Sequence, residues 1–238
     1  MHSPNNQHQA DAFAARGFVV VMPDQFAGDA APNTKAVSEE DAKEMVEAQN
    51  PSLLERIKLG AAETAKSFLI DMWLARHTPE KVLPVLQKVL EAAREEFADA
   101  VANGDGVYGV GYCFGGKYVL RLCAESDAGA GKDEESQKLQ GSQLKCGAIA
   151  HGTDITADDI AGVKVPVAIA AVSGDQLFPD DVREQGKATL AMNGVGHEVK
   201  VFEGVPHGFA VVGDYKDEEI ESAQAEAFEF MAGWLEAR

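Results

Sequence analysis

Three short segments contain residue types that could act together in acyl transfer. Cys113 stands in "GYCFGG" (111–116), Asp175 in "SGDQLFP" (173–179) and His207 in "GVPHGF" (204–209). A thiolate can attack an acyl carbon, an imidazole can take up the thiol proton, and a carboxylate can orient the imidazole. These residue types predict a cysteine nucleophile with a histidine base.

The segment around Cys113 has the pattern G-x-C-x-G, which is the cysteine counterpart of the G-x-S-x-G nucleophile elbow. We expect a strand to end and a helix to begin there, with Gly111 and Gly115 letting the two approach closely. The N-terminus of that helix favours a thiolate. The N–H of Phe114 would then donate to the oxyanion. On this motif alone, a packed thiol in an ordinary strand-to-helix turn is an equally good interpretation.

The order of the three residues along the chain favours the catalytic interpretation. Nucleophile, acid and histidine follow one another in this order in α/β-hydrolases. Taken alone, Asp175 is typical of a turn or a helix cap, and His207 of a surface. Each of the three nevertheless follows a predicted strand, and ligands of parallel sheets bind at the carboxyl ends of the strands.

Apolar runs alternate with helical patterns along most of the chain, which predicts a mostly parallel sheet with helices on both faces. We expect one α/β domain over residues 1–238. The strands are expected at residues 17–24, 106–112, 146–152, 165–175 and 197–204, and the main helices at residues 4–16, from Pro79 onward, and at 115–125, 179–194 and 218–237.

Composition limits the classes of partner. Lys and Arg number 21 against 39 Asp and Glu, giving a formal net charge of −18, which disfavours nucleic acids and anionic membranes. No apolar run reaches the roughly 18 residues of a membrane span, and the polar N-terminus does not resemble a signal peptide. The three cysteines, an odd number without metal-ligand spacing, indicate reduced thiols and a cytoplasmic location.

The three motifs resemble those of the dienelactone hydrolase family, in particular its fungal branch. The opening "HSPNNQHQADAFAARGFVVVMPDQFAGD" and the segment "WLARHTPEKV" are similar to that family as well. The resemblance implies an α/β-hydrolase fold, Cys113 as nucleophile, His207 as base and Asp175 as the orienting carboxylate. It also implies carboxymethylenebutenolidase-like opening of a small enol lactone, without cofactor or metal.

One departure from the family concerns the N-terminus. Family members carry two or three strands before the segment that corresponds to "HSPNN", and the loop after them supplies the second oxyanion donor. We therefore expect a sheet without its N-terminal strands, in a sequence that is either a shortened gene model or isoform or a chain with impaired activity. The alternatives are a general carboxylesterase or thioesterase, and a truncated pseudoenzyme that binds small acids or a partner protein.

A few further residues have chemical side chains but are interpreted as structural. His151 follows a predicted strand and could contact substrate, although a structural role is favoured. Arg76 and Arg183 could bind a substrate carboxylate, although ion pairs are the commoner use of such residues. Cys123 and Cys146 are expected to be packed thiols.

Overall fold

The structure is a computed structural model that describes residues 4–31, 72–124, 142–211 and 215–238. Its contacts divide the chain into two compact units. Residues 23–87 form the smaller unit, and residues 2–22 with 88–238 form the larger one, which contains all the candidate catalytic residues. The two units are described separately below.

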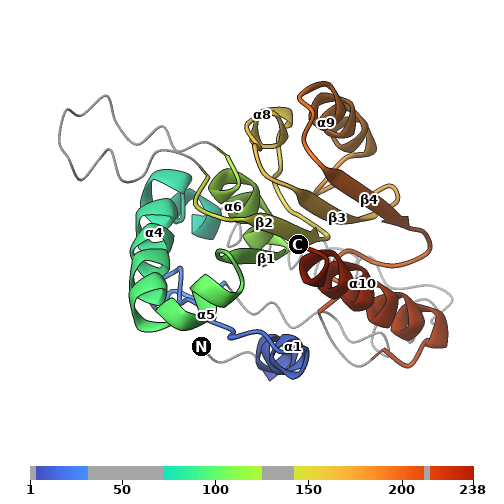
Figure 1. The fold of residues 1–238 in the computed structure, drawn as a ribbon. Coiled ribbons are helices and arrows are strands. Elements are labelled where there is room, and N and C mark those ends of the chain that lie inside the picture. The colour runs from blue at the N-terminus through green and yellow to red at the C-terminus, as the bar shows by residue number, and fades with distance from the viewer. Residues whose placement is uncertain (1–3, 32–71, 125–141, 212–214) are drawn as a thin grey trace, which may run out of the picture. The chain divides into compact units, whose positions relative to one another are not determined.

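A parallel four-stranded sheet organises the larger unit (Figure 1). Its spatial order, β1-β2-β3-β4, equals the order along the chain, and each neighbouring pair is parallel. The prediction of a mostly parallel α/β fold is therefore confirmed. The strands are β1 (Tyr108–Tyr112), β2 (Cys146–Ala150), β3 (Val167–Val172) and β4 (His197–Phe202), and the helices that follow them are α6 (Phe114–Leu122), α8 (Ala157–Ala161), α9 (Asp180–Met192) and α10 (Glu218–Glu236).

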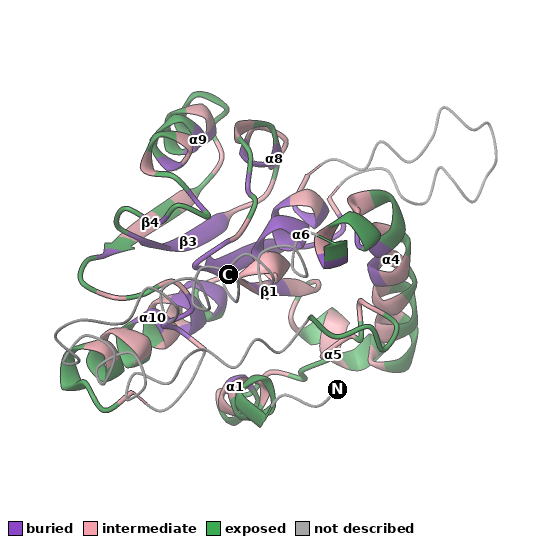
Figure 2. Ribbon diagram, turned by 180° about the vertical axis from the view of Figure 1, so that it is seen from behind, coloured by how far each residue is buried: buried purple, intermediate pink, exposed green. Residues whose placement is uncertain are grey.

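The two central strands form the core of this unit. Every residue of β2 and β3 is buried, whereas β1 and β4 are partly exposed (Figure 2). On one face, alanines of the central strands pack against Met231 and Trp234 of α10 and against Phe13 of α1 (Pro4–Ala15). Helix α6 packs against β1 and β2, and α8 lies beside α6 and α9. Continuous apolar runs are expected for strands that are covered on both faces.

The expected strand at residues 17–24 is absent, which corrects the prediction. These residues form no ladder, and Val19, Val20 and Val21 are 56%, 38% and 43% exposed. Within the described part of the chain, β1 pairs with β2 alone, and no ladder joins its other edge to this run. Instead Phe18 packs edge-on against Tyr108, with ring centroids 6.0 Å apart. An apolar run becomes a strand only where a neighbour satisfies its backbone groups.

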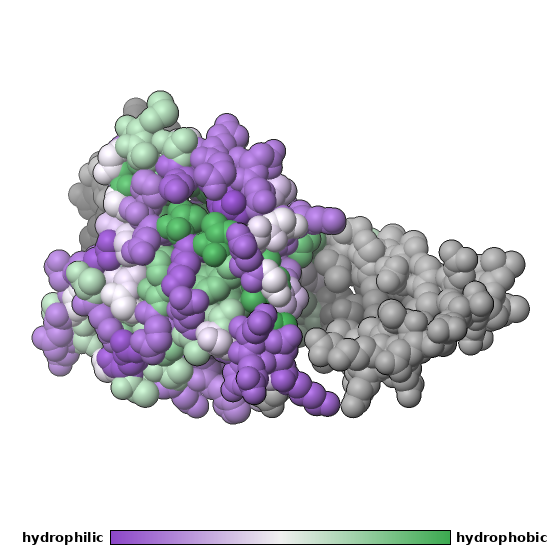
Figure 3. All heavy atoms as spheres, turned by 90° about the vertical axis from the view of Figure 1, so that its right-hand side faces the viewer, coloured by the Kyte–Doolittle hydropathy of each residue, from purple (hydrophilic) through white to green (hydrophobic). Residues whose placement is uncertain are grey.

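Charged side chains fix α1 to the end of α10. The Arg16 guanidinium binds the carboxylates of Glu229 and Glu236, with closest N–O distances of 2.8 and 2.7 Å. Elsewhere on this unit hydrophilic residues are frequent, as the acidic composition leads one to expect. Figure 3 shows one face on which they surround a smaller hydrophobic area.

The smaller unit contains the start of α4 (Pro79–Glu96), which begins at Pro79 as predicted and runs on toward α5 (Ala98–Asn103). Its residues 72–76 are helical, and the buried Trp73 donates its indole N–H to the carbonyl oxygen of Asp29 at 2.8 Å. Arg76 forms an ion pair with the Asp29 carboxylate at 3.1 Å, the use that the sequence favours. Over the described ranges, no helix is both long and apolar enough to cross a membrane.

Candidate active site

Cys113 occupies the sharp turn between β1 and α6. Its φ of 50° and ψ of −122° lie outside the regions that non-glycine residues usually adopt, as expected for a nucleophile elbow. A Cβ at Gly111 would lie 2.6 Å from the carbonyl oxygen of Gly115, so strand and helix backbones touch there. Gly115 itself has open space, contrary to expectation. The close approach falls instead on Gly116, where a Cβ would lie 3.3 Å from Gly152 Cα.

Backbone hydrogen bonds tie this turn to the end of β2. The Cys113 N–H donates to the carbonyl of Ala150 at 3.1 Å. The Cys113 carbonyl accepts from the N–H of Gly116 at 3.0 Å and from that of Thr153 at 3.1 Å. These bonds hold the strained turn with its partly exposed thiol, and α6 begins directly after it at Phe114.

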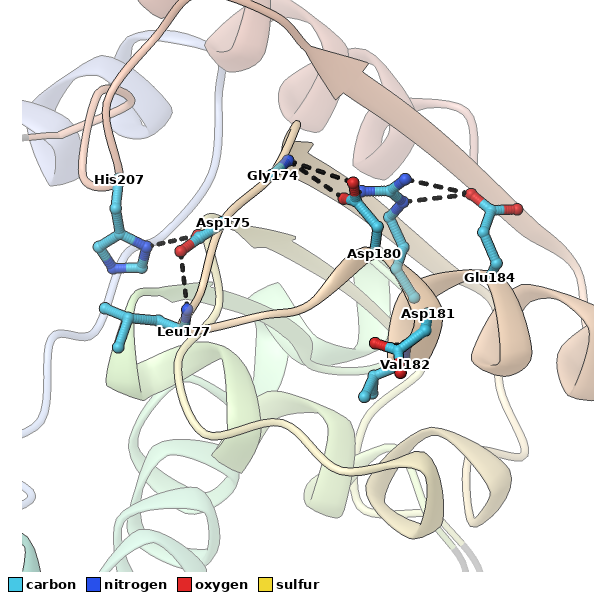
Figure 4. A network of polar contacts seen from close by, with 9 residues as sticks. Gly174, Asp175, Leu177, Asp180, Asp181, Val182, Glu184 and His207 are labelled. Atoms are coloured by element: carbon cyan, nitrogen blue, oxygen red, sulfur yellow. Dashed lines mark hydrogen bonds and ion pairs between the residues drawn. The ribbon is translucent and has the colours of Figure 1, made fainter.

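His207 lies between Cys113 and Asp175. Its Nε2 is 3.4 Å from the Cys113 Sγ, and its Nδ1 is 2.6 Å from an oxygen of Asp175. The other Asp175 oxygen accepts the N–H of Leu177 at 2.9 Å, which fixes the carboxylate toward the imidazole (Figure 4). Asp175 is 8% exposed. The structure thus brings the three sequence-predicted residues into one hydrogen-bonded line.

Thr153 is a fourth member of the site that the sequence analysis did not single out. Its hydroxyl lies 3.1 Å from the Cys113 Sγ and 3.1 Å from the His207 Nε2. The loop around it is fixed by the Asp154 N–H, which donates to the Leu177 carbonyl at 3.0 Å, and by an ion pair between Lys117 and Asp154 at 2.6 Å. Its position directly after β2 was the available signal, because site residues gather at the carboxyl ends of parallel strands.

His151, for which the sequence favoured a structural role, lies against the site. It is fully buried, it has a positive φ of 36°, and its ring centroid is 5.2 Å from that of His207. Neither of its ring nitrogens has a hydrogen-bond partner of good geometry among the described residues, although the ring is near enough to the Cys113 sulfur to affect its pKa. One ring nitrogen of His151, the Cys113 Sγ and a ring nitrogen of His207 all lie within 4.8 Å of one another.

These neighbours change the acidity of the thiol and the imidazole. Burial raises the pKa of Cys113, but His151, His207 and Thr153 together outweigh it and lower that pKa to about 5. Burial lowers the pKa of His207, and the contacts with Cys113 and Asp175 outweigh it, so the pKa of His207 is raised. Near neutral pH the Cys113 thiol is therefore largely a thiolate, and the raised pKa of His207 favours the imidazolium beside it; the two groups titrate as a coupled pair.

The other candidate groups are engaged elsewhere. Arg183 is 7% exposed, and its guanidinium forms ion pairs with the carboxylates of Asp180 and Glu184, the use that the sequence favours. Cys123 and Cys146 are fully buried, as predicted. Burial raises the pKa of both thiols, that of Cys146 to about 11.

Comparison with known proteins agrees with this geometry. A protein-family model described as "Dienelactone hydrolase family" matches residues 2–238. The chain belongs to the dienelactone hydrolase family. It is 30% identical over 231 residues to hydrolase pyvD of Aspergillus violaceofuscus and to hydrolase tropI of Talaromyces stipitatus. In each case 97% of this chain and 74% of the relative are covered. Dienlactone hydrolase 1 of Gibberella moniliformis is 25% identical, and there 87% of this chain and 63% of the relative are covered.

Solved structures show the same fold at low identity. A structure from Klebsiella pneumoniae, assigned as a dienelactone hydrolase, superposes with a TM-score of 0.51 at 18% identity, covering 69% of this chain and 65% of that one. A thermophilic esterase from Thermogutta terrifontis gives a TM-score of 0.51 at 14% identity, covering 65% of each chain. Both likenesses support the α/β architecture of this dienelactone hydrolase family member.

Thiol acidity leads to a first prediction. Iodoacetamide should label Cys113 far faster than Cys123 or Cys146, and the rate should rise through a pH of about 5 and then level off. A thiol with a pKa near 8.5 would be only a few per cent thiolate at neutral pH. Peptide mapping after limited alkylation across a pH series measures both effects. The Thr153→Val variant should shift the rise to higher pH, because the thiolate loses a hydrogen-bond donor.

The two buried thiols are the internal controls of this experiment, since they should react only after unfolding. Preferential labelling of either one in the native protein would reject Cys113 as the reactive thiol. A Cys113 that reacts only in denaturant would favour a pseudoenzyme.

Proposed function

We propose that the chain is a cysteine-dependent hydrolase that opens enol lactones or cleaves activated carboxylic esters. The observation that carries the proposal is the line from Cys113 through His207 to Asp175, with distances of 3.4 and 2.6 Å. Membership of the dienelactone hydrolase family supports the same class of reaction. The substrate is a small molecule, and no cofactor takes part in the steps below.

Acylation begins with the thiolate of Cys113. Its sulfur attacks the acyl carbon and forms a C–S bond, while the electrons of the carbonyl π bond move to the oxygen. The Phe114 N–H, at the start of α6, is the oxyanion donor that the elbow offers. One such donor is worth about 10²–10³ in rate. The C–O bond then breaks and the enolate or phenolate leaves as an anion, which afterwards takes up the proton of the His207 imidazolium.

Deacylation uses the same residues with the proton moving the other way. Neutral His207 takes a proton from water, and the resulting hydroxide attacks the thioester carbon. The tetrahedral intermediate expels the thiolate of Cys113, which restores the starting ion pair with His207. Asp175 holds the imidazole in one orientation throughout.

The choice of sulfur limits the substrates. A thiolate attacks well and also leaves well, so a tetrahedral intermediate with a poorer leaving group returns to substrate. Alkoxides and amines leave less readily than the thiolate unless an acid protonates them. Enolates, phenolates and other thiolates leave readily enough to compete with the Cys113 thiolate, so the intermediate can go forward to the acyl-enzyme. Enol lactones, aryl esters and thioesters are therefore the favoured substrate classes.

A substrate panel with a matched acyl group tests the proposal. Turnover should be fastest for the enol lactone and for the p-nitrophenyl ester and thioester, and slowest for the ethyl ester and the amide. Initial rates on all five compounds, measured with one enzyme preparation, give the order directly. Faster turnover of the ethyl ester or the amide than of the enol lactone would favour a general esterase or amidase instead. A preference for the thioester alone would indicate a thioesterase.

A further inference from the structure

The hydrolytic mechanism above gives His151 no proton transfer or bond of its own, although its ring helps to lower the pKa of the Cys113 thiol. This side chain is 0% exposed, and in the described part of the chain neither ring nitrogen has a hydrogen-bond partner of good geometry; its polar contact is with the Cys113 sulfur, whose pKa it lowers. Burying a polar group without a partner costs free energy, so such a group in a native protein calls for an explanation, for example an ion that binds there. The ring stands edge-on to His207, with ring centroids 5.2 Å apart at an interplanar angle of 74°.

The donor set around His151 suits a soft divalent cation. A sulfur from Cys113 and one imidazole nitrogen each from His151 and His207 lie within 4.8 Å of one another. Thiolate and imidazole ligands are those that Zn²⁺ prefers, whereas Mg²⁺ and Ca²⁺ prefer oxygen ligands. Three protein ligands with one position left for water are typical of an open zinc site.

The distances fit this coordination after a small movement. Zn–S and Zn–N bonds of about 2.3 and 2.0–2.1 Å in a tetrahedral site put neighbouring donor atoms about 3.3–3.6 Å apart. The Cys113 Sγ and His207 Nε2 are already 3.4 Å apart. The nitrogen of His151 has to move inward by at most about 1.5 Å from the 4.8 Å limit. The Asp175 carboxylate on the other nitrogen of His207 is the outer partner that zinc-bound histidines commonly have.

We propose that Cys113, His151 and His207 bind one Zn²⁺ per chain and that this metal is a reversible inhibitor of the site. Coordination would engage the sulfur lone pair that attacks substrate and the nitrogen that transfers protons, and the proton of the Cys113–His207 pair would leave to solvent. The inhibition rests on the proposed hydrolase function, whereas the binding does not.

Titration of the full chain with Co²⁺ as a spectroscopic probe tests the binding. We expect one Co²⁺ per chain, with a thiolate-to-cobalt charge-transfer band and the visible absorption of tetrahedral cobalt, and both should disappear when Zn²⁺ is added. The Cys113→Ser variant should lose the charge-transfer band. His151→Gln should weaken binding by at least about tenfold. The matched control is His197→Gln on β4. The imidazole of His197 contacts the Val195 carbonyl at 2.8 Å, and this variant should bind Co²⁺ as tightly as wild type does.

Each outcome decides the proposal. A wild-type protein without a charge-transfer band at millimolar Co²⁺ overturns it, and so does a His151→Gln variant that binds metal as tightly as wild type. Circular dichroism checks the fold of the variants. Should His151→Gln fail to fold, X-ray absorption on the cobalt-loaded wild-type protein decides. The proposed site should show tetrahedral cobalt with two nitrogen ligands and one sulfur ligand from the protein. A site made of Cys113 and His207 alone would show only one nitrogen ligand, and that result overturns the proposal.

Inhibition is measured separately, so the two proposals can fail independently. Zn²⁺ should inhibit hydrolysis of the enol lactone, and EDTA should restore it. His151→Gln should require at least about tenfold more Zn²⁺ for half-inhibition. A chain that binds Co²⁺ as described but hydrolyses none of the panel would refute the hydrolase proposal and leave the metal site supported. An active chain that millimolar Zn²⁺ does not inhibit would refute the inhibitory role.

Discussion

His207→Ala should lower kcat/KM by roughly 10⁴–10⁶ and Asp175→Asn by roughly 10⁴, the scale seen when a triad member is removed from a hydrolase. His207 lies 3.4 Å from the nucleophile and is positioned to carry both proton transfers. Asp175 is 8% exposed and binds the imidazole at 2.6 Å, so its amide analogue would let the ring adopt the wrong tautomer. Initial rates on the enol lactone, with circular dichroism as the check on folding, measure the effect.

Asp180→Asn is the matched control for the aspartate change. Asp180 stands five residues after Asp175, at the start of α9, and it binds Arg183 and the Gly174 N–H (Figure 4). Its replacement should change activity by less than about twofold, because the asparagine keeps an oxygen that can accept from the Gly174 N–H and from Arg183, and the side chain takes no part in the reaction. An Asp175→Asn variant that is also within about twofold of wild type would exclude this carboxylate as the partner of His207.

The order of strands and helices could be predicted from the sequence because each central strand is covered on both faces. Residues 146–150 and 167–172 are buried at every position, so their apolar runs carry the signal directly. The run at residues 17–24 carries the same signal and forms no strand, and Val19 is 56% exposed. Hydrophobicity reports how well a segment suits a buried strand. Whether a neighbouring strand is available for pairing depends on the rest of the fold.

The proximity of Cys113, Asp175 and His207 was predictable for a related reason. Each follows a strand of one parallel sheet, and the carboxyl ends of such strands meet at one edge. Thr153 and His151 share that position after β2, yet nothing in "AHGTD" indicates which side chains turn toward the thiol. That choice depends on backbone bonds between distant segments, such as the Thr153 N–H to the Cys113 carbonyl at 3.1 Å. A single sequence does not carry this information.

Cys113→Ser should reduce turnover of the enol lactone by roughly 10²–10⁴, the range that general-base assistance is worth, because a serine hydroxyl has to lose its proton during attack. The wild-type thiol has a pKa of about 5 and is already ionised near neutral pH. The variant should also change its preference. A serine alkoxide leaves less readily than a thiolate, so an intermediate with an ethoxide leaving group no longer returns so readily to substrate, and the ratio of ethyl ester to enol lactone turnover should rise.

The same five-substrate panel measures this change, with Cys123→Ser as the matched control. Cys123 is fully buried at the C-terminal end of α6, so its replacement should leave the substrate order as in wild type, even if the protein becomes less stable. A Cys113→Ser variant with an unchanged ratio would mean that the leaving-group competition is not decided at sulfur, and substrate shape would then have to explain any preference for lactones. A variant as active as wild type on the enol lactone would remove the thiolate from the mechanism, since a residue of much higher pKa would be doing the same chemistry.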